Sequence, residues 1–260
     1  MKNLSILVTG GAGFIGSNLA NKLAKENEVI AIDNEYLGTQ SNLDESVDFQ
    51  QMDVLDTDLP TDVDIIFHLA ALSSYQMHKQ DPVTGSRVNV EGFINTVKQG
   101  MENGCRKVVY ASTSSIYGSR KTPTSEKMEI ESRTGYEASK LARERYAEYF
   151  HNQYGIQMAG LRFFSVYQGY GGNESHKGKY ANIIAQFADE IAKGIGPEIY
   201  GDGSQTRDFT HIEDVVRAAE MIGEEDISGV YNVGTGRAVS FNEIVDMINV
   251  ELGANVEARY

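Results

Sequence analysis

The chain has 260 residues, of which 23 are basic and 37 acidic, giving a formal net charge of -14, and it contains a single cysteine, Cys105. This charge argues against electrostatic binding to nucleic acid or to an anionic membrane, and one cysteine excludes an intrachain disulfide framework. No apolar run reaches the roughly 18 residues of a membrane span, and no secretory leader is recognised, so we expect a cytoplasmic protein. The five histidines lie far apart, so we expect no structural metal.

Along the first two thirds of the chain, short apolar runs alternate with amphipathic stretches. The apolar runs predict strands at residues 4–10, 28–33, 64–70, 107–112 and 157–163. The stretches between them predict helices at residues 14–25, 82–101 and 136–151. The strands are continuously hydrophobic, as strands covered on both faces are. The alternation therefore predicts βαβ units in an α/β protein, with a doubly wound parallel sheet of the Rossmann type.

The pattern changes after Phe164. Residues 167–180 are rich in glycine and poor in large aliphatic side chains, which predicts a long loop with a function. Then follow a predicted helix near 181–193, a glycine-rich turn at 200–209, a helix from 212, a strand at 229–236 and a helix from 241. We expect a main domain at 1–165 with a returning segment at about 207–236, and a smaller substrate-binding lobe at 166–206 and 237–260.

The turn after the first predicted strand carries Gly10, Gly13 and Gly16 and opens a helix. Glycine lets this backbone turn tightly and approach a pyrophosphate, whose charge is met by the helix N-terminus. Glycine-rich turns are common, but the dinucleotide fingerprint also places an acid about 20 residues on, at the end of the next strand. Asp33 lies there, followed by Asn34 instead of an arginine. Although Asp33 could be an ordinary strand-end residue, the ordered set predicts NAD in preference to NADP.

Tyr136 and Lys140 are four residues apart at the start of a predicted helix, so their side chains share one face. Tyrosine is a poor base at neutral pH, but a neighbouring ammonium group lowers the pKa of a phenol. Taken alone, such a pair would usually be a solvated helix face. Here the strand end ASTSSIYG, about 20 residues upstream, adds hydroxyl groups at the edge where open parallel sheets bind ligands. The pair is therefore a candidate acid–base unit.

With these motifs the chain resembles the extended short-chain dehydrogenase/reductase family, and within it the NAD-dependent nucleotide-sugar epimerases and dehydratases of the UDP-glucose 4-epimerase type. The resemblance covers essentially the whole chain through VTGGAGFIG, HLAA, STSSIYG, YEASK, LRFFSVY, YGDGSQTRDFTHIEDV and YNVGTG. It implies that Thr113, Tyr136 and Lys140 are catalytic. In this assignment Tyr136 is the base and Lys140 binds the nicotinamide ribose.

The resemblance also implies contacts to the cofactor and to the substrate. The implied cofactor contacts, from the pyrophosphate and adenine to the inner end, are Phe14, Ile15, Asp53, Val54, Leu69, Ala70, Ala71, Asn89 and Phe164. The implied substrate contacts are Thr113, Ser165, Asn182, Tyr200 and Arg207. Among them Arg207 would face the diphosphate, and Ser165 stands where the family usually has asparagine.

Members of the family pair the helix after Asn89 with the helix of Tyr136 into a four-helix bundle, so the resemblance implies a homodimer. The candidates for its apolar seam are Phe93, Tyr146, Tyr149 and Phe150. Alternatively, these aromatic side chains belong to the core within one chain.

The residues after Thr113 bear on the reaction. Relatives that eliminate water carry Asp-Glu there, and decarboxylating relatives carry Glu two places before the tyrosine of IYG, whereas this chain has Ser114 and Ser115. Neither serine is an acid or base at neutral pH. The resemblance therefore implies a UDP-sugar 4-epimerase, an isomerase that oxidises C4 and returns the hydride to either face. Alternatives are a related dehydratase or reductase, or an NAD-binding protein without chemistry.

The chain ends at Tyr260, where family members usually run on with another diphosphate-binding arginine. We therefore expect the substrate lobe to be incomplete. The candidate sugars are glucose and galactose, their N-acetyl forms and the uronic acids.

Overall fold

The computed structural model describes residues 1–118, 124–169 and 172–260. The chain divides into two compact units, the first comprising Met1–Phe163 and Glu213–Val233 and the second Phe164–Ile212 and Gly234–Tyr260. The segment that returns to the first unit is therefore shorter at both ends than the predicted 207–236, because residues 207–212 and 234–236 belong to the second unit.

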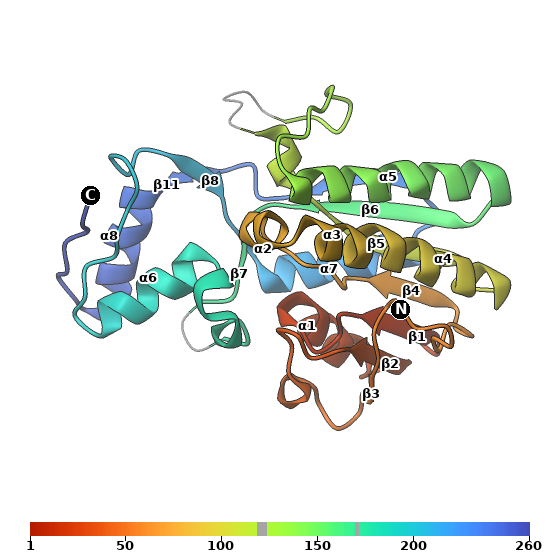
Figure 1. Ribbon diagram of the computed structural model, residues 1–260. Helices are drawn as coiled ribbons and strands as arrows, with labels where there is room; N and C mark the ends of the chain where they lie inside the picture. The colour runs from red at the N-terminus through yellow and green to blue at the C-terminus, as the bar shows by residue number, and fades with distance from the viewer. Residues whose placement is uncertain (119–123, 170–171) are drawn as a thin grey trace. The chain divides into compact units, whose positions relative to one another are not determined.

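A seven-stranded sheet forms the centre of the first unit, in the order β10-β6-β5-β4-β1-β2-β3 (Figure 1). All of its strand pairs are parallel. Its strands are β1 (Ser5–Thr9), β2 (Glu28–Asp33), β3 (Asp48–Gln51), β4 (Ile65–His68), β5 (Lys107–Thr113), β6 (Gln157–Phe163) and β10 (Gly229–Val233). The predicted α/β fold of the Rossmann type is confirmed. The apolar pattern does not predict edge strand β3, because its residues DFQQ are mostly polar and partly exposed.

The helices of the first unit connect these strands. They are α1 (Phe14–Leu23), α2 (Tyr75–Gln80), α3 (Pro82–Ser86), α4 (Gly92–Glu102), α5 (Gly135–Tyr154) and α7 (Ile212–Glu224). Helix α7 begins at the last residue of the second unit. Two short 3-10 helices, η1 (Gln40–Asn42) and η3 (Ser114–Tyr117), also belong to the first unit. The helix predicted at 82–101 is instead divided by a π-helical segment, η2 (Arg87–Glu91). This wider turn contains the buried Asn89, and π segments are frequent at functional sites.

The main core lies between the sheet and helices α4 and α5, which pack beside each other. Phe93 of α4 is fully buried and Phe150 of α5 is 5% exposed, and both belong to this core. The interpretation of these two residues as a dimer seam is therefore wrong. By contrast, Tyr146 and Tyr149 of α5 are 41% and 48% exposed.

The second unit has its own core between helices α6 (Ile183–Ala192) and α8 (Phe241–Leu252). Strands β8 (Thr206–Asp208) and β11 (Ala238–Ser240) pair antiparallel, and β7 (Val166–Tyr167) pairs with β9 (Thr210–His211) in parallel. A capping box of Ser240 and Glu243 starts α8. The segment predicted as a loop contains a kinked 3-10 helix, η4 (Ser175–Tyr180), and its residues 170 and 171 lie outside the described ones.

Across the described residues, no helix combines the length and the apolar character needed to cross a membrane. In the same residues, no three His, Cys, Asp or Glu side chains gather in a way that could hold a metal ion.

Candidate active site

The glycine loop between β1 and α1 is a tight turn. Gly10 has a φ of +66°, and a Cβ added to Gly16 would lie 2.1 Å from the Gly10 carbonyl oxygen. Gly13 is the N-cap of α1 and, being glycine, brings no capping side chain. The predicted pyrophosphate residues Phe14 and Ile15 form its first turn. The main chain at the helix start is therefore suited to an anion.

Asp33 at the end of β2 is joined to the glycine loop. Its carboxylate accepts hydrogen bonds from the main-chain N–H groups of Ala12, at 3.2 Å, and Glu35, at 2.8 Å. Desolvation by burial raises the pKa of Asp33, and these hydrogen bonds oppose the shift. The neighbouring Asn34 donates to Asp53 at 2.8 Å. Three of the predicted cofactor residues thus lie together at one edge of the sheet.

The segment after β4 lies against the glycine loop. A Cβ on Gly10 would be 2.7 Å from the Ala70 main-chain nitrogen, and Ala70 also donates to Thr9 Oγ1 at 3.2 Å. Leu69 and Ala71 flank Ala70, so this predicted inner wall lies beside the predicted pyrophosphate site. Val54 is buried and packs against α4, where a Cβ on Gly92 would meet it at 2.5 Å.

Asn89 is fully buried and its carboxamide is committed to bonds within the protein. It accepts a hydrogen bond from the Leu72 N–H at 2.8 Å, and it donates to the Leu72 carbonyl at 3.1 Å and to Ser139 Oγ at 2.9 Å. Its side-chain nitrogen lies 3.0 Å from His78 Nε2. Asn89 therefore fixes the wall of the site from behind. Phe164, the last predicted cofactor contact, belongs to the second unit.

Thr113, Tyr136 and Lys140 come together at the carboxyl end of β5. Thr134 caps α5 by accepting the Glu137 N–H at 3.1 Å, which sets where this helix begins. The Thr113 side chain lies close enough to the Tyr136 hydroxyl to lower the pKa of Tyr136. Lys140 is 2% exposed, donates to the Ala111 carbonyl at 3.1 Å and has its nitrogen 5.8 Å from the centre of the Tyr136 ring.

Desolvation governs the charges of this cluster. It raises the pKa of Tyr136, against a hydrogen bond from Thr113 and the positive charge of Arg143, which favour the phenolate. It also lowers the pKa of Lys140 well below its usual range, and Arg143 adds to this effect. The upward shift for Tyr136 is opposite to the one expected from the Lys140 charge alone, because desolvation outweighs it.

Three residues that pack behind this cluster are not identified by the sequence motifs. The His78 ring lies edge-on to Tyr136 with centroids 5.7 Å apart, and Ser139 Oγ donates to the Tyr136 carbonyl at 2.8 Å. Arg143 is fully buried. Ser139 and Arg143 could have been found from their spacing, since they follow Tyr136 by three and seven residues on one helix face. No comparable signal marks His78.

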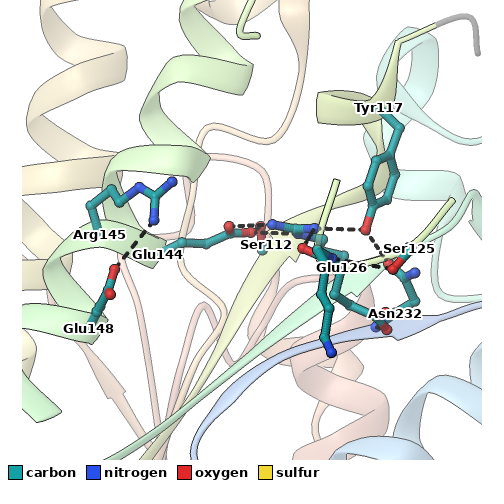
Figure 2. Close-up of polar contacts among 10 residues, drawn as sticks. Ser112, Tyr117, Ser125, Glu126, Glu144, Arg145, Glu148 and Asn232 are labelled. Atoms are coloured by element: carbon teal, nitrogen blue, oxygen red, sulfur yellow. Dashed lines mark hydrogen bonds and ion pairs between the residues drawn. The ribbon is translucent and has the colours of Figure 1, made fainter. Parts of the chain in front are cut away.

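A buried ion pair supports the strand end that carries Thr113. Arg162 of β6 donates to both carboxylate oxygens of Glu144, at 2.9 and 2.7 Å, and Ser112 donates to the same carboxylate at 2.5 Å. Arg162 also donates to the Tyr117 hydroxyl at 2.7 Å, and Tyr117 donates to Asn232 of β10 at 2.7 Å. Figure 2 shows Glu144, Ser112, Tyr117 and Asn232 in this chain of contacts. The network ties β5, β6, β10 and α5 together.

The four substrate candidates outside the first unit lie in different elements of the second. Ser165 precedes β7, and its carbonyl accepts the Thr210 N–H at 3.3 Å. The Asn182 side chain caps α6, Tyr200 is 86% exposed, and the Arg207 guanidinium lies 6.0 Å from the centre of the Phe241 ring. Within the described residues, no hydrogen bond joins any two of the four side chains.

Known proteins share this arrangement of motifs. The model of the NAD-dependent epimerase/dehydratase family matches residues 6–234. The chain is similar to a putative UDP-glucose 4-epimerase of Methanocaldococcus jannaschii, with 36% identity over 98% of this chain and 85% of that protein. It is also similar to UDP-glucuronic acid decarboxylase 6 of Arabidopsis thaliana, with 31% identity over 99% of this chain and 77% of that protein.

Among solved structures, the fold is similar to that of UDP-N-acetylglucosamine 4-epimerase from Methanobrevibacter ruminantium M1, in complex with UDP-N-acetylmuramic acid. The TM-score is 0.94 at 31% identity, and the match covers 100% of this chain and 86% of that one.

Proposed function

The chain belongs to the NAD-dependent epimerase/dehydratase family, and we propose that its reaction is the 4-epimerisation of a UDP-sugar. Family membership leaves the reaction open, since both a 4-epimerase and a decarboxylase are among the similar proteins. The observation that favours epimerisation is the cluster of Thr113, Tyr136 and Lys140 at a strand end that continues with two serines instead of carboxylates.

NAD, the cofactor of this family, would supply the acceptor and donor of the hydride exchanged with C4 of the sugar in the proposed reaction. In our proposal the start of α1 binds its pyrophosphate, Asp33 its adenosine ribose and Lys140 its nicotinamide ribose. The residues fit these roles. No side chain can be accommodated between Gly16 and Gly10, and the N-cap of α1 is a glycine, while Asp33 is held at the edge of the same loop.

Tyr136 is the proposed base. Its phenolate would take the proton of the C4 hydroxyl during oxidation and return it during reduction, and the Thr113 hydroxyl, which favours the phenolate, would share that proton. Because desolvation raises the pKa of Tyr136, the anionic form depends on positive charge nearby.

Carboxylates near the strand end are engaged elsewhere. Glu144 accepts hydrogen bonds from Arg162 and Ser112, and Glu126 accepts the Asn232 N–H at 2.9 Å. Ser114 and Ser115 cannot serve as acid or base at neutral pH. Because these two carboxylates are engaged and the two serines are neither acids nor bases, return of the hydride is the favoured outcome.

The test is incubation of the purified protein with UDP-glucose, UDP-galactose, their N-acetyl forms and UDP-glucuronic acid, without added reductant. An epimerase yields C4 isomers of identical mass and no net NADH. A product lighter by one water would refute epimerisation. A product lighter by carbon dioxide, or steady release of NADH, would also refute the proposal.

We also propose a homodimer that pairs α4 and α5 of two copies. The exposed aromatic residues available for this seam are Tyr146 and Tyr149, with Tyr154 next to them, since Tyr149 and Tyr154 share a hydrogen bond of 3.1 Å between their hydroxyls. The oligomeric state in solution, measured by light scattering, tests this proposal.

A further inference from the structure

Arg143 of α5 is fully buried, which is rare for an arginine. Within the described residues it makes no ion pair with a carboxylate, because its neighbour Glu144 is bonded to Arg162. A buried charge without a counter-ion is costly in free energy. The position therefore needs a physical reason beyond packing.

The guanidinium of Arg143 joins the two main-chain segments behind the proposed cofactor wall. Its Nη2 donates to the Ala70 carbonyl at 2.7 Å, and its Nε donates to the Asn89 carbonyl. Its carbon centre lies 5.8 Å from the centre of the Phe93 ring. The remaining nitrogen, Nη1, has no hydrogen-bond partner among the described residues. Two neutral carbonyls stabilise the group but do not neutralise it.

The groups that face Arg143 come from four elements. They are Tyr136 and Lys140 of α5, Tyr110 of β5, His68 of β4 and His78 of α2. Desolvation holds the pKa values of both histidines and of Lys140 below their usual ranges, and that of Tyr110 far above it. Burial lowers the pKa of Arg143 to about 9, which leaves it cationic at neutral pH. Within this set, the Tyr136 phenolate is the group suited to balance the charge.

We propose that Arg143 is a positioning residue for the reaction, which clamps the Ala70 and Asn89 segments and supplies the permanent positive charge that favours the anionic form of Tyr136. The proposal rests on the proposed function in taking Tyr136 as the base. The two cations then have different roles: Lys140 binds the ribose, while Arg143 keeps its charge through the whole reaction.

The test compares Arg143→Met, which removes the charge at similar length, with Arg143→Lys, which keeps a charge. The control is Arg145→Met, because Arg145 lies on the same helix with its side chain 72% exposed and paired with Glu148. Two readouts are followed against pH: the rate of isomerisation, and the ultraviolet absorbance of the Tyr136 phenolate. The phenolate signal is taken as the difference between each protein and the same protein carrying Tyr136→Phe.

Arg143→Met should lower the isomerisation rate at neutral pH by about tenfold, the effect of one pKa unit. The rate should recover as pH rises, with the Tyr136 titration moving upward by the same amount. Arg143→Lys should restore most of both, and Arg145→Met should change neither. If Arg143→Met lowers the rate equally at all pH values and leaves the Tyr136 titration unchanged, Arg143 is only structural and the proposal is wrong.

The phenolate titration also separates this proposal from the function. If the wild-type protein isomerises no UDP-sugar, the proposed function fails, yet an upward shift of the Tyr136 titration in Arg143→Met would still support the electrostatic role. If isomerisation is observed and the titration does not move, the role of Arg143 fails alone.

Discussion

The buried pair of Arg162 and Glu144 allows a sharp prediction about stability. Their side chains are 5% and 6% exposed, and the carboxylate accepts three hydrogen bonds, two from Arg162 and one from Ser112. Glu144→Ala would leave the guanidinium buried and without its counter-ion. Removing one partner of a buried ion pair costs about 3–5 kcal/mol. At about 2–4 °C per kcal/mol, Tm should fall by roughly 6–20 °C.

Thermal unfolding followed by circular dichroism measures this loss. Glu148→Ala on the same helix is the matched control, because its ion pair with Arg145 is exposed at 61% and 72%, and exposed pairs contribute little. The double replacement Glu144→Met with Arg162→Met should recover much of the stability, since apolar side chains of similar volume can replace a buried pair. If Glu144→Ala and Glu148→Ala lowered Tm equally, the network would not support the strand end as argued.

Four further predictions follow from the geometry. Tyr136→Phe should retain NAD, as identified after denaturation, but lose about 10²–10⁴-fold in turnover, and wild-type rates would show that the base is misassigned. Burial, with the charges of Arg143 and Lys140, holds the pKa of His68 well below its usual value. The unfolded chain therefore binds a proton at His68 that the folded chain does not bind. The free energy of unfolding, measured by urea unfolding, should fall as pH drops below about 6.5. Burial raises the pKa of Cys105 to about 11, so its alkylation should be slow until the protein unfolds. Tyr149→Ser should shift the protein toward monomer in light scattering without a large loss of stability, whereas an unchanged dimer would place the interface elsewhere.

The sheet and the cofactor loop could be predicted because their signals are local. Strands β1, β2, β4, β5 and β6 are continuous apolar runs, and the glycines follow β1 directly. Strand β3 lies at the sheet edge, where burial does not demand an apolar sequence. The helix predicted at 82–101 has no sequence signal for a break after Ser86, because the π-helical turn depends on tertiary packing around Asn89.

Aromatic residues on a helix show why side-chain type alone does not decide between core and interface. Phe93 and Phe150 are buried in the core, whereas Tyr146 and Tyr149 are exposed, although the sequence predicts all four as one seam. The angular position along α5 separates Tyr149, which lies about 100° from Phe150, but not Tyr146, which precedes Phe150 by four residues and lies within about 40° of it. The exposure of a residue at the margin of the buried face therefore depends on what packs against it.

The angular position around α5 also separates two arginines of this helix. In the segment KLARER, Arg143 and Arg145 look alike and both suggest a solvated helix face. Measured from the proposed catalytic pair, Arg143 lies three residues after Lys140 and seven after Tyr136, on their side of the helix, and Arg145 lies away from it. A residue at that phase must be buried wherever Tyr136 and Lys140 point into the protein. The assignment of a catalytic helix face from sequence therefore already predicts which neighbouring arginine is buried, and this is the charge that we propose acts on Tyr136.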